Sequence, residues 1–400
     1  MPTSASTQAP PKVSPFYDPK VRGIVYQVVL VSAVVLLFYL AASNAARNLQ
    51  AARIASGFGF LDNTAGFDVS QSLIRFSAAG STYGQAFTVG LLNTLVVGVI
   101  GIFFATILGF LVGIGRLSKN WIVAKVATVY VEVIRNLPLL LQLLFWYVAV
   151  LAALPEPRES LNIGAGFFLN KRGLTMPKPI LDDRAWLIPV MLSLGIVLTV
   201  AFHLWAKRQQ AATGRQYPVL LTGLALIIGL PALAWIGLGV ASHNPITFEL
   251  PEQGRFNLRG GTSLLPEFVA LFLGLTTYTA GFIAEVVRAG ILAVSKGQTE
   301  AANALGLRAA PTLRLVVIPQ AMRVIIPPLT SQYLNLVKNS SLAVAIGYPD
   351  LVQVFMGTVL NQTGQAIEVV VITMAVYLTI SLVTSFFMNI YNRRVAIVER

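Results

Sequence analysis

The sequence predicts an all-α polytopic membrane protein with about eight transmembrane helices, for two reasons. First, apolar residues make up 56% of the 400 residues and charged residues only 11%, against about 25% charged in an average soluble domain. Second, long runs such as 187–204 and 369–388 contain no Asp, Glu, Lys or Arg. These runs approach or reach the roughly 20 residues that a helix needs to cross a bilayer. Helices satisfy their backbone polar groups within the segment, as lipid requires.

Apolar runs define the predicted spans, taken in order along the chain. They are 23–42, 86–115, 122–153, 186–206, 218–240, 264–293, 323–346 and 367–391. Residues 1–22 are predicted to be a cytoplasmic tail rich in small and polar residues. The first run is longer than the 7–15 apolar residues of a cleaved signal peptide, so we expect a retained anchor. Pro138 predicts a kink inside the third run.

The distribution of basic residues predicts the orientation. With both termini in the cytoplasm and alternating spans, most of the carboxylates fall in the outer loops, whereas the inner loops are mainly basic. The outer loops also contain basic residues such as Arg47, Arg53, Lys171 and Arg172, so the bias is real but incomplete. The inner basic residues include Arg116, Lys119, Lys207, Arg208, Arg215, Lys296, Arg308 and Arg314. The net charge of +13 comes from residues scattered at the ends of apolar runs, so we predict contact with the lipid bilayer and no nucleic-acid partner. Cysteine is absent, which excludes disulfides.

Signatures of enzymes are missing from the sequence. It contains no G-x-x-x-x-G-K-[ST] phosphate loop. His203 and His243 lie far apart and have no metal-ligand spacing. We therefore predict no catalytic residue, no metal site and no cofactor bound by this chain.

The segment after the sixth span is the most informative one. Residues 296–323 are too polar to cross a membrane and too apolar to be disordered. Helix formers fill 299–307, and several prolines follow, which predicts two short helices joined by a turn on the cytoplasmic face. Small side chains at Ala301 and Ala302 would let a partner approach closely, and Gly306 permits a sharp change of direction. An ordinary amphipathic surface loop is the alternative.

This segment resembles the "EAA" loop of the permease subunits of bacterial ATP-binding-cassette importers. The match consists of Glu300-Ala301-Ala302, then Gly306, then Val316-Val317-Ile318-Pro319. Motifs at 90–95, 135–140, 285–291 and 338–342 resemble the polar amino-acid branch of that family. The resemblance implies that the loop at 294–322 couples the chain to an ATPase subunit. The implied coupling residues are Glu300, Ala301, Ala302, Gly306, Ile318 and Pro319.

The resemblance also implies a five-helix permease core, formed by 86–153 and 264–392. Outside this core lie an anchor helix with a periplasmic segment (23–85), an inserted loop with two further spans (154–263) and a cytoplasmic tail (393–400). This layout resembles the larger permease of general L-amino acid or glutamate/glutamine/aspartate/asparagine systems. The implied partners are two copies of a nucleotide-binding ATPase subunit, a second and non-identical permease and a periplasmic amino-acid-binding protein. The implied location is the bacterial inner membrane.

Charges inside the predicted spans are candidates for the transport pathway or its gate, because each is costly in lipid. Glu132 with Arg135, and Glu285 with Arg288, have an i,i+3 spacing that predicts ion pairs, either structural or gating. If the seventh helix begins near Pro327, Lys338 lies about 16 Å along it, near mid-bilayer. Lys338 then faces the pathway, or it pairs with a carboxylate. The candidate carboxylates are Glu285, Glu132 and Glu368.

Other polar and small residues in the spans have two interpretations. Asn93, Gln142, Asn335 and Asn339 are either pathway residues or partners in helix–helix hydrogen bonds. The spacing of Gly109 and Gly113 permits close helix packing.

We therefore predict a permease subunit of an ATP-driven importer of polar L-amino acids that works by alternating access. An ion-coupled secondary transporter is the alternative; it would need acidic residues arranged as an intramembrane relay. A membrane scaffold that transports nothing is the third possibility.

Overall fold

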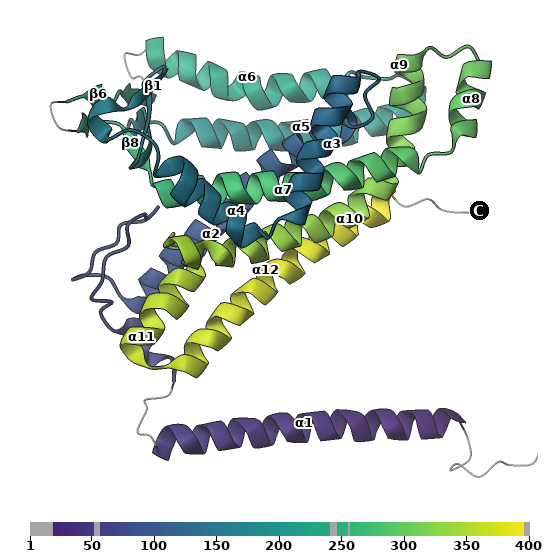
Figure 1. Ribbon diagram of the computed structural model, residues 1–400. Coiled ribbons are helices and arrows are strands. Elements are labelled where there is room, and N and C mark those ends of the chain that lie inside the picture. Colours follow the sequence, from purple (N-terminus) through teal and green to yellow (C-terminus); the bar gives the residue numbers. More distant parts are fainter. Residues whose placement is uncertain (1–18, 52–56, 241–245, 255–256, 396–400) are drawn as a thin grey trace, which may run out of the picture.

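A computed structural model describes residues 19–51, 57–240, 246–254 and 257–395 (Figure 1). Within these ranges, seven helices are long and apolar enough to cross a membrane. Counting the bent helix pair at 121–151 as one further span gives up to eight. This confirms the predicted all-α membrane fold. The predicted cytoplasmic tail at 1–22 lies mostly outside the described residues.

Helices dominate the chain. The helices are α1 (Pro19–Ala51), η2 (Phe58–Asp62), α2 (Tyr83–Gly115), α3 (Trp121–Asn136), α4 (Leu139–Leu144), η3 (Phe145–Leu151), η4 (Pro157–Glu159), α5 (Leu187–Thr213), α6 (Val219–Val240), α7 (Pro266–Leu292), α8 (Lys296–Ala304), α9 (Ala309–Thr312), η5 (Leu313–Val317), α10 (Ile318–Asn339), η6 (Ser340–Ile346), η7 (Val352–Val359), α11 (Leu360–Thr363) and α12 (Ala366–Val395).

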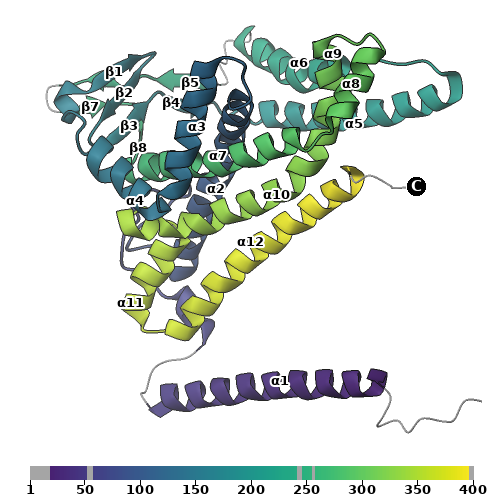
Figure 2. The same cartoon turned by 45° about the vertical axis from the view of Figure 1, so that its right-hand side comes forward.

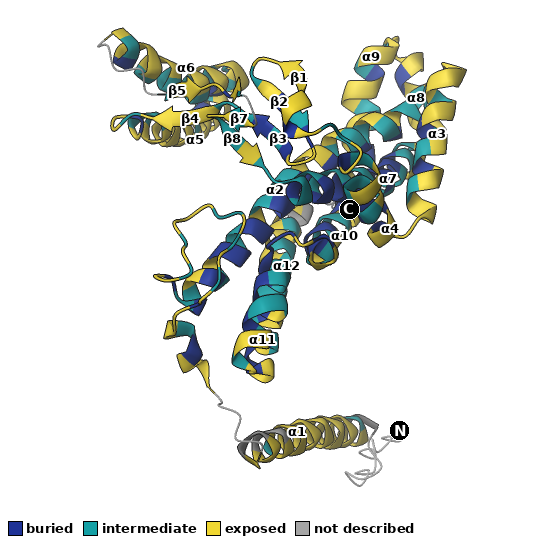
Figure 3. Cartoon of the chain, turned by 60° about the vertical axis from the view of Figure 1, so that its left-hand side comes forward, coloured by how far each residue is buried: buried dark blue, intermediate teal, exposed yellow. Residues whose placement is uncertain are grey.

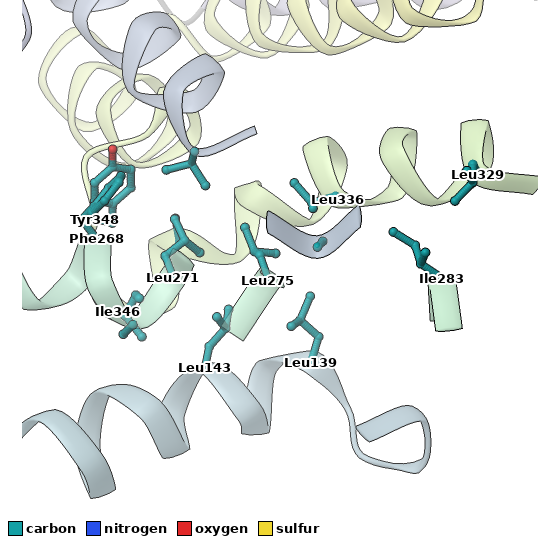
Figure 4. Packing of buried hydrophobic residues seen from close by; sticks show 14 of the residues in the cluster. Leu139, Leu143, Phe268, Leu271, Leu275, Ile283, Leu329, Leu336, Ile346 and Tyr348 are labelled. Atoms are coloured by element: carbon teal, nitrogen blue, oxygen red, sulfur yellow. The ribbon is translucent and has the colours of Figure 1, made fainter. Parts of the chain in front are cut away.

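The central layer is formed by α2, α7 and α10, which pack along one another. Lipid tails are as apolar as leucine, so close packing has to hold such helices together. A Cβ atom at Gly113 would lie 2.7 Å from the carbonyl oxygen of Ala284, and one at Gly109 would lie 2.5 Å from Ile283. The two glycines therefore let α2 and α7 touch, in agreement with their spacing in the sequence. Buried leucines complete this core; Leu139 and Leu143 of α4 lie below Leu271 and Leu275 of α7 (Figure 4).

The third span is broken. Leu137 is extended and Pro138 precedes α4, so α3 and the α4–η3 segment meet at a bend of 109°. The break leaves backbone carbonyls without helical partners. The side-chain amide of Gln142 donates to the carbonyl oxygens of Ile134 at 2.8 Å and Leu137 at 3.0 Å. The Gln142 side chain therefore stabilises the kink that was predicted from Pro138. Of the two interpretations given for Gln142, the structure favours hydrogen bonding between helical segments.

The inserted segment contains strands that the sequence analysis did not predict. The strands are β1 (Leu161–Gly164), β2 (Phe167–Asn170), β3 (Gly173–Met176), β4 (Lys178–Leu181), β5 (Ile246–Glu249), β6 (Glu252–Gln253), β7 (Leu258–Arg259) and β8 (Thr262–Leu264). They form an antiparallel sheet in the order β1-β2-β3-β8 and the two-stranded ladders β4-β5 and β6-β7. They lie at the end of the molecule opposite to α8 (Figure 2). Four-residue strands with little apolar alternation give a weak signal in the sequence.

Two helical elements lie outside the core. The apolar stretch of α1 has no buried residue, and α5 and α6 pack mainly on each other. Both are largely exposed (Figure 3). Exposed apolar helices of this length are suited to contact with lipid or with a partner helix.

Candidate functional site

The segment proposed for coupling begins with a short projecting helix. In α8, Glu300 and Ala301 are exposed, whereas Ala302 is buried against the rest of the chain. The side chains of Gln298 and Gln320 hydrogen bond at 3.3 Å and connect α8 to the start of α10. Figure 1 shows α8 beside α9 at one end of the molecule. The helix is thus held on one face and free on the other.

Gly306 ends α8. Its φ of +76° lies in the left-handed region that favours glycine. The Leu307 amide donates to the carbonyl oxygen of Ala302 at 3.1 Å, which closes the last turn as in a Schellman motif. Leu305, directly before Gly306, and Leu315, after the turn, are 82% and 65% exposed. The turn therefore presents apolar side chains beside the free face of α8.

The second of the two predicted short helices is not separate. The chain continues from α9 through the π-helical turn η5 into α10, so a single helical path runs over 309–346. Pro327 and Pro328, expected to mark the start of the seventh helix, lie inside α10. Helices in membranes tolerate such prolines because neighbouring groups satisfy the freed carbonyls. Ile318 and Pro319 are exposed in the first turn of α10.

A charge cluster joins three helices at the end that carries α8. The carboxylate of Glu285 on α7 accepts from Arg288 at 2.6 Å, lies 3.7 Å from Arg135 of α3 and forms an ion pair with Arg116 at the end of α2. Arg135 also stacks over Phe282 at 5.3 Å from the ring centroid. Glu285 and Arg116 are 25% and 12% exposed. One carboxylate therefore serves three guanidinium groups.

The two ion pairs predicted from the i,i+3 spacing have different outcomes in the structure. Glu285 and Arg288 do pair. Among the described residues, however, Glu132 and Arg135 form no ion pair, because Arg135 turns toward Glu285 and Glu132 is exposed. That prediction was wrong: helical spacing puts two side chains on one face, but the approach of α3 to α7 decides which partner is nearer. Sequence reasoning also missed Arg116.

Lys338 lies in the last turn of α10. Because α10 begins at Ile318 and not near Pro327, Lys338 lies about 30 Å along the helix instead of about 16 Å. In the described part of the chain, Lys338 forms no ion pair. Glu285 is occupied by arginines, and Glu368 accepts from the Gly57 amide at 2.7 Å. The ion pair considered for Lys338 is therefore not formed.

Lys338 lines a cavity of about 500 Å³ between α10, η7 and α12. Met356, Met374 and Leu378 supply apolar walls, and Tyr377 adds a hydroxyl group. None of the described residues that line this cavity is Asp or Glu. The cavity can therefore accept an anionic group beside the Lys338 amine and an apolar group against the methionines.

The turn that precedes η7 contains Asp350, which lies behind Tyr377 of this cavity. The sequence analysis did not identify Asp350. Asp350 is fully buried; its carboxylate accepts from the Gln353 amide at 2.8 Å and from the Tyr377 hydroxyl at 3.3 Å. Burial raises the pKa of Asp350 to about 6. From α2, the Asn93 side chain donates to the Pro349 carbonyl oxygen at 2.9 Å. Asn93, a pathway candidate in the sequence, therefore has a structural role here.

Comparison with known proteins agrees with this architecture. Residues 101–397 match the family described as "Binding-protein-dependent transport system inner membrane component". The general L-amino acid transport system permease protein AapQ of Rhizobium johnstonii is 55% identical over 387 residues, which cover 97% of this chain and 95% of AapQ. The putative amino-acid ABC transporter permease protein YhdX of Escherichia coli is 52% identical, covering 96% and 97%.

A third relative has the same extent. The glutamate/glutamine/aspartate/asparagine transport system permease protein BztB of Rhodobacter capsulatus is 41% identical and covers 96% of both chains. Full-length matches at this identity confirm the resemblance seen in the sequence motifs. The chain belongs to the family of binding-protein-dependent transport system inner membrane components, and it is a multi-pass permease subunit.

Proposed function

We propose that this chain is the permease subunit of an ATP-driven importer that moves polar L-amino acids into the cell. The relatives' names support an amino-acid substrate. The observation that carries the proposal for this chain is the pairing of a projecting helix, α8, with a cavity at the opposite end of α10 that contains Lys338. Helix α8 is suited to contact an ATPase subunit, and the Lys338 cavity is suited to contact the transported substrate.

The coupling residues are Glu300, Ala301, Ala302, Gly306, Ile318 and Pro319. Within the described chain, the side chain of Glu300 forms no ion pair, and the exposed Leu305 caps the same helix. A charged group beside exposed leucines suits a cleft on an ATPase subunit. Because α9 continues into α10, a displacement of this end would move the whole helix that carries Lys338. Coupling requires that the ATPase binds this surface differently in its two states.

The pathway candidates have distinct roles in the proposal. The Lys338 amine would contact the carboxylate of an amino acid, and the apolar wall would accommodate the rest of the molecule. Glu285, Arg288 and Arg135 would hold α3 and α7 together near the side that faces the ATPase. Glu132 is exposed and pairs with no basic residue in the ranges that the structure describes, so we assign it no role.

The complete importer would contain two ATPase subunits, a second, non-identical permease and a periplasmic amino-acid-binding protein. In this arrangement both termini and α8 face the cytoplasm, and the β-strands face the periplasm. The scarcity of carboxylates in the loops on the α8 side supports this orientation.

The deciding experiment uses the assembled complex in proteoliposomes. With ATP inside and the binding protein outside, we expect uptake of labelled polar amino acids that ionophores do not change. Glu300→Arg should leave the assembly intact and abolish substrate-stimulated ATP hydrolysis, whereas Glu132→Arg serves as a charge-matched control. Uptake that persists without ATP and collapses with an ionophore would instead identify an ion-coupled transporter. No uptake under any condition would favour a scaffold.

A further inference from the structure

The α5–α6 hairpin carries a groove with a polar half and an apolar half. The polar half is a cavity of about 320 Å³ lined by His203, Lys207, Gln210 and Tyr217. The apolar half is a cavity of about 330 Å³ lined by residues such as Val200, Leu220, Leu224 and Ile227. His203 and Val219 line both cavities. The two halves therefore join end to end.

Close packing of the two helices brings the walls of the groove together. A Cβ atom at Gly223 would lie 2.8 Å from the Thr199 methyl group, and one at Gly195 would lie 2.6 Å from the Leu226 carbonyl oxygen. Helices α5 and α6 therefore pack closely on each other, and these contacts determine the shape of the hairpin. Only 6% of the apolar stretch of each helix is buried, and α5 and α6 are coloured mostly as exposed in Figure 3.

The polar half lies at the depth of lipid headgroups. Lys207 comes 20 residues after Leu187, the first residue of α5, which is about 30 Å along the helix and equals the thickness of the hydrocarbon layer. Trp205 and Tyr217 lie beside it, with ring centroids 4.9 Å apart. Aromatic side chains gather at this level of a membrane. Figure 2 shows this end of the hairpin on the same side of the molecule as α8.

The charge at this end is positive and uncompensated. Lys207, Arg208 and Arg215 fall within nine residues, and no Asp or Glu occurs over 184–248. In the ranges that the structure describes, none of these three residues forms an ion pair. Basic clusters at the end of a transmembrane helix attract anionic lipids.

We infer that this groove binds an anionic phospholipid from the leaflet on the α8 side. The headgroup phosphate would lie against Lys207 and His203, with Arg208 and Arg215 adding to the positive potential. One acyl chain would follow the apolar half along Leu220, Leu224 and Ile227. A free phosphate would fill only the polar half, and a zwitterionic lipid would leave the excess positive charge without a partner. The inference does not depend on the transported substrate.

The test measures quenching of Trp205 in the assembled complex. The complex is placed in nanodiscs of phosphatidylcholine with increasing amounts of phosphatidylglycerol that carries brominated acyl chains. The contribution of Trp205 is the difference between the wild-type complex and one with Trp205→Phe. We expect saturable quenching by the anionic lipid at a low mole fraction, and weak, non-saturating quenching by brominated phosphatidylcholine.

Two kinds of variant separate the halves of the site. Lys207→Gln should raise the half-saturating fraction about fivefold, the effect of one basic residue at a membrane surface, and Lys207→Gln with Arg208→Gln and Arg215→Gln should raise it further. Val200→Phe should reduce the depth of quenching without changing the charge. Lys119→Gln, an exposed basic residue on another loop, is the matched control and should change nothing.

Several outcomes would overturn the inference. Equal quenching by the two brominated lipids would show ordinary lipid contact, and equal shifts in the Lys119 and Lys207 variants would show a general surface charge. Loss of quenching on addition of excess inorganic phosphate would show a site for the free anion. These readouts do not require transport, so they are independent of the proposed function.

Discussion

The guanidinium group of Arg116 pairs with the carboxylate of Glu285, although 169 positions separate the two residues. This ion pair joins the end of α2 to α7 at the point where both helices approach the side that carries α8. Arg288 and Arg135 complete the cluster around the same carboxylate. Both Arg116 and Glu285 are less than one third exposed, so water screens their interaction only partly.

Removing the shared carboxylate should therefore destabilise the helix junction. Glu285→Gln leaves three guanidinium groups without a counter-ion, and we expect a loss of stability of about 2 kcal/mol or more, toward the range for breaking a buried ion pair. Thermal unfolding of the purified complex, followed by tryptophan fluorescence, would measure it. Glu132→Gln is the matched control, because Glu132 is on the neighbouring helix and forms no ion pair in the described chain. Equal melting temperatures for the two variants would contradict the assignment.

Most of the spans could be predicted from the sequence, because they are long apolar runs with polar ends. The break at Pro138 was also predictable, since proline lacks an amide hydrogen and the preceding residue avoids the helical conformation. The start of α10 was not: Pro327 and Pro328 have the local features of a helix boundary, but they lie inside a helix whose neighbours compensate for them. The residues around Pro327 and Pro328 in the sequence do not show which groups of neighbouring helices satisfy the freed carbonyls.

Charge partners were harder to predict than helices. The i,i+3 rule found Glu285 with Arg288 but also suggested Glu132 with Arg135. Arg135 reaches Glu285 because Gly281 lets α3 approach α7; a Cβ atom there would lie 3.0 Å from Ile134. The choice depends on tertiary packing, and a single sequence does not contain it. Asp350 was missed for the same reason, since its burial comes from α2 and α12.

The turn at Gly306 provides a prediction about coupling. A β-branched side chain is strained at a φ of +76°, at a cost of about 1–2 kcal/mol. Gly306→Val should therefore reorient α8 and strongly reduce substrate-stimulated ATP hydrolysis in the reconstituted complex. Gly306→Asn should retain most of it, because asparagine tolerates this conformation and no atom lies within 4 Å of an added Cβ. Similar stimulation in both variants would separate the turn from coupling.

Lys338 provides a prediction about the substrate. Lys338→Met keeps the length of the side chain and removes the charge, so we expect uptake of labelled amino acid to fall at least about tenfold, the loss of one charge-assisted contact. Lys338→Arg should keep part of the activity. Complex abundance in the membrane must be measured in parallel: reduced abundance would identify a structural role, and normal uptake by Lys338→Met would remove Lys338 from the pathway.

The buried carboxylate of Asp350 predicts how stability depends on pH. Burial raises the pKa of Asp350 to about 6 in the folded chain, whereas an unfolded Asp has a pKa of about 3.9. The folded state therefore binds the proton more tightly. The stability from this group is fully present below pH of about 4 and is lost as pH rises through about 6. A shift of about two pH units corresponds to about 3 kcal/mol. Thermal unfolding of the complex between these pH values would measure the change.

The matched variant for this prediction is Asp350→Asn. The asparagine oxygen can still accept from the Gln353 amide, which lies 2.8 Å from the native carboxylate, but the side chain has no charge to bury. Wild type should gain stability relative to this variant as pH falls from 7 to 4, and the other titrating groups cancel in the difference. Melting temperatures that change in parallel with pH would show that Asp350 keeps the same charge over this range. In that case, the Tyr377 hydroxyl and the backbone amides of Val352 and Gln353 would stabilise the carboxylate more strongly than burial destabilises it.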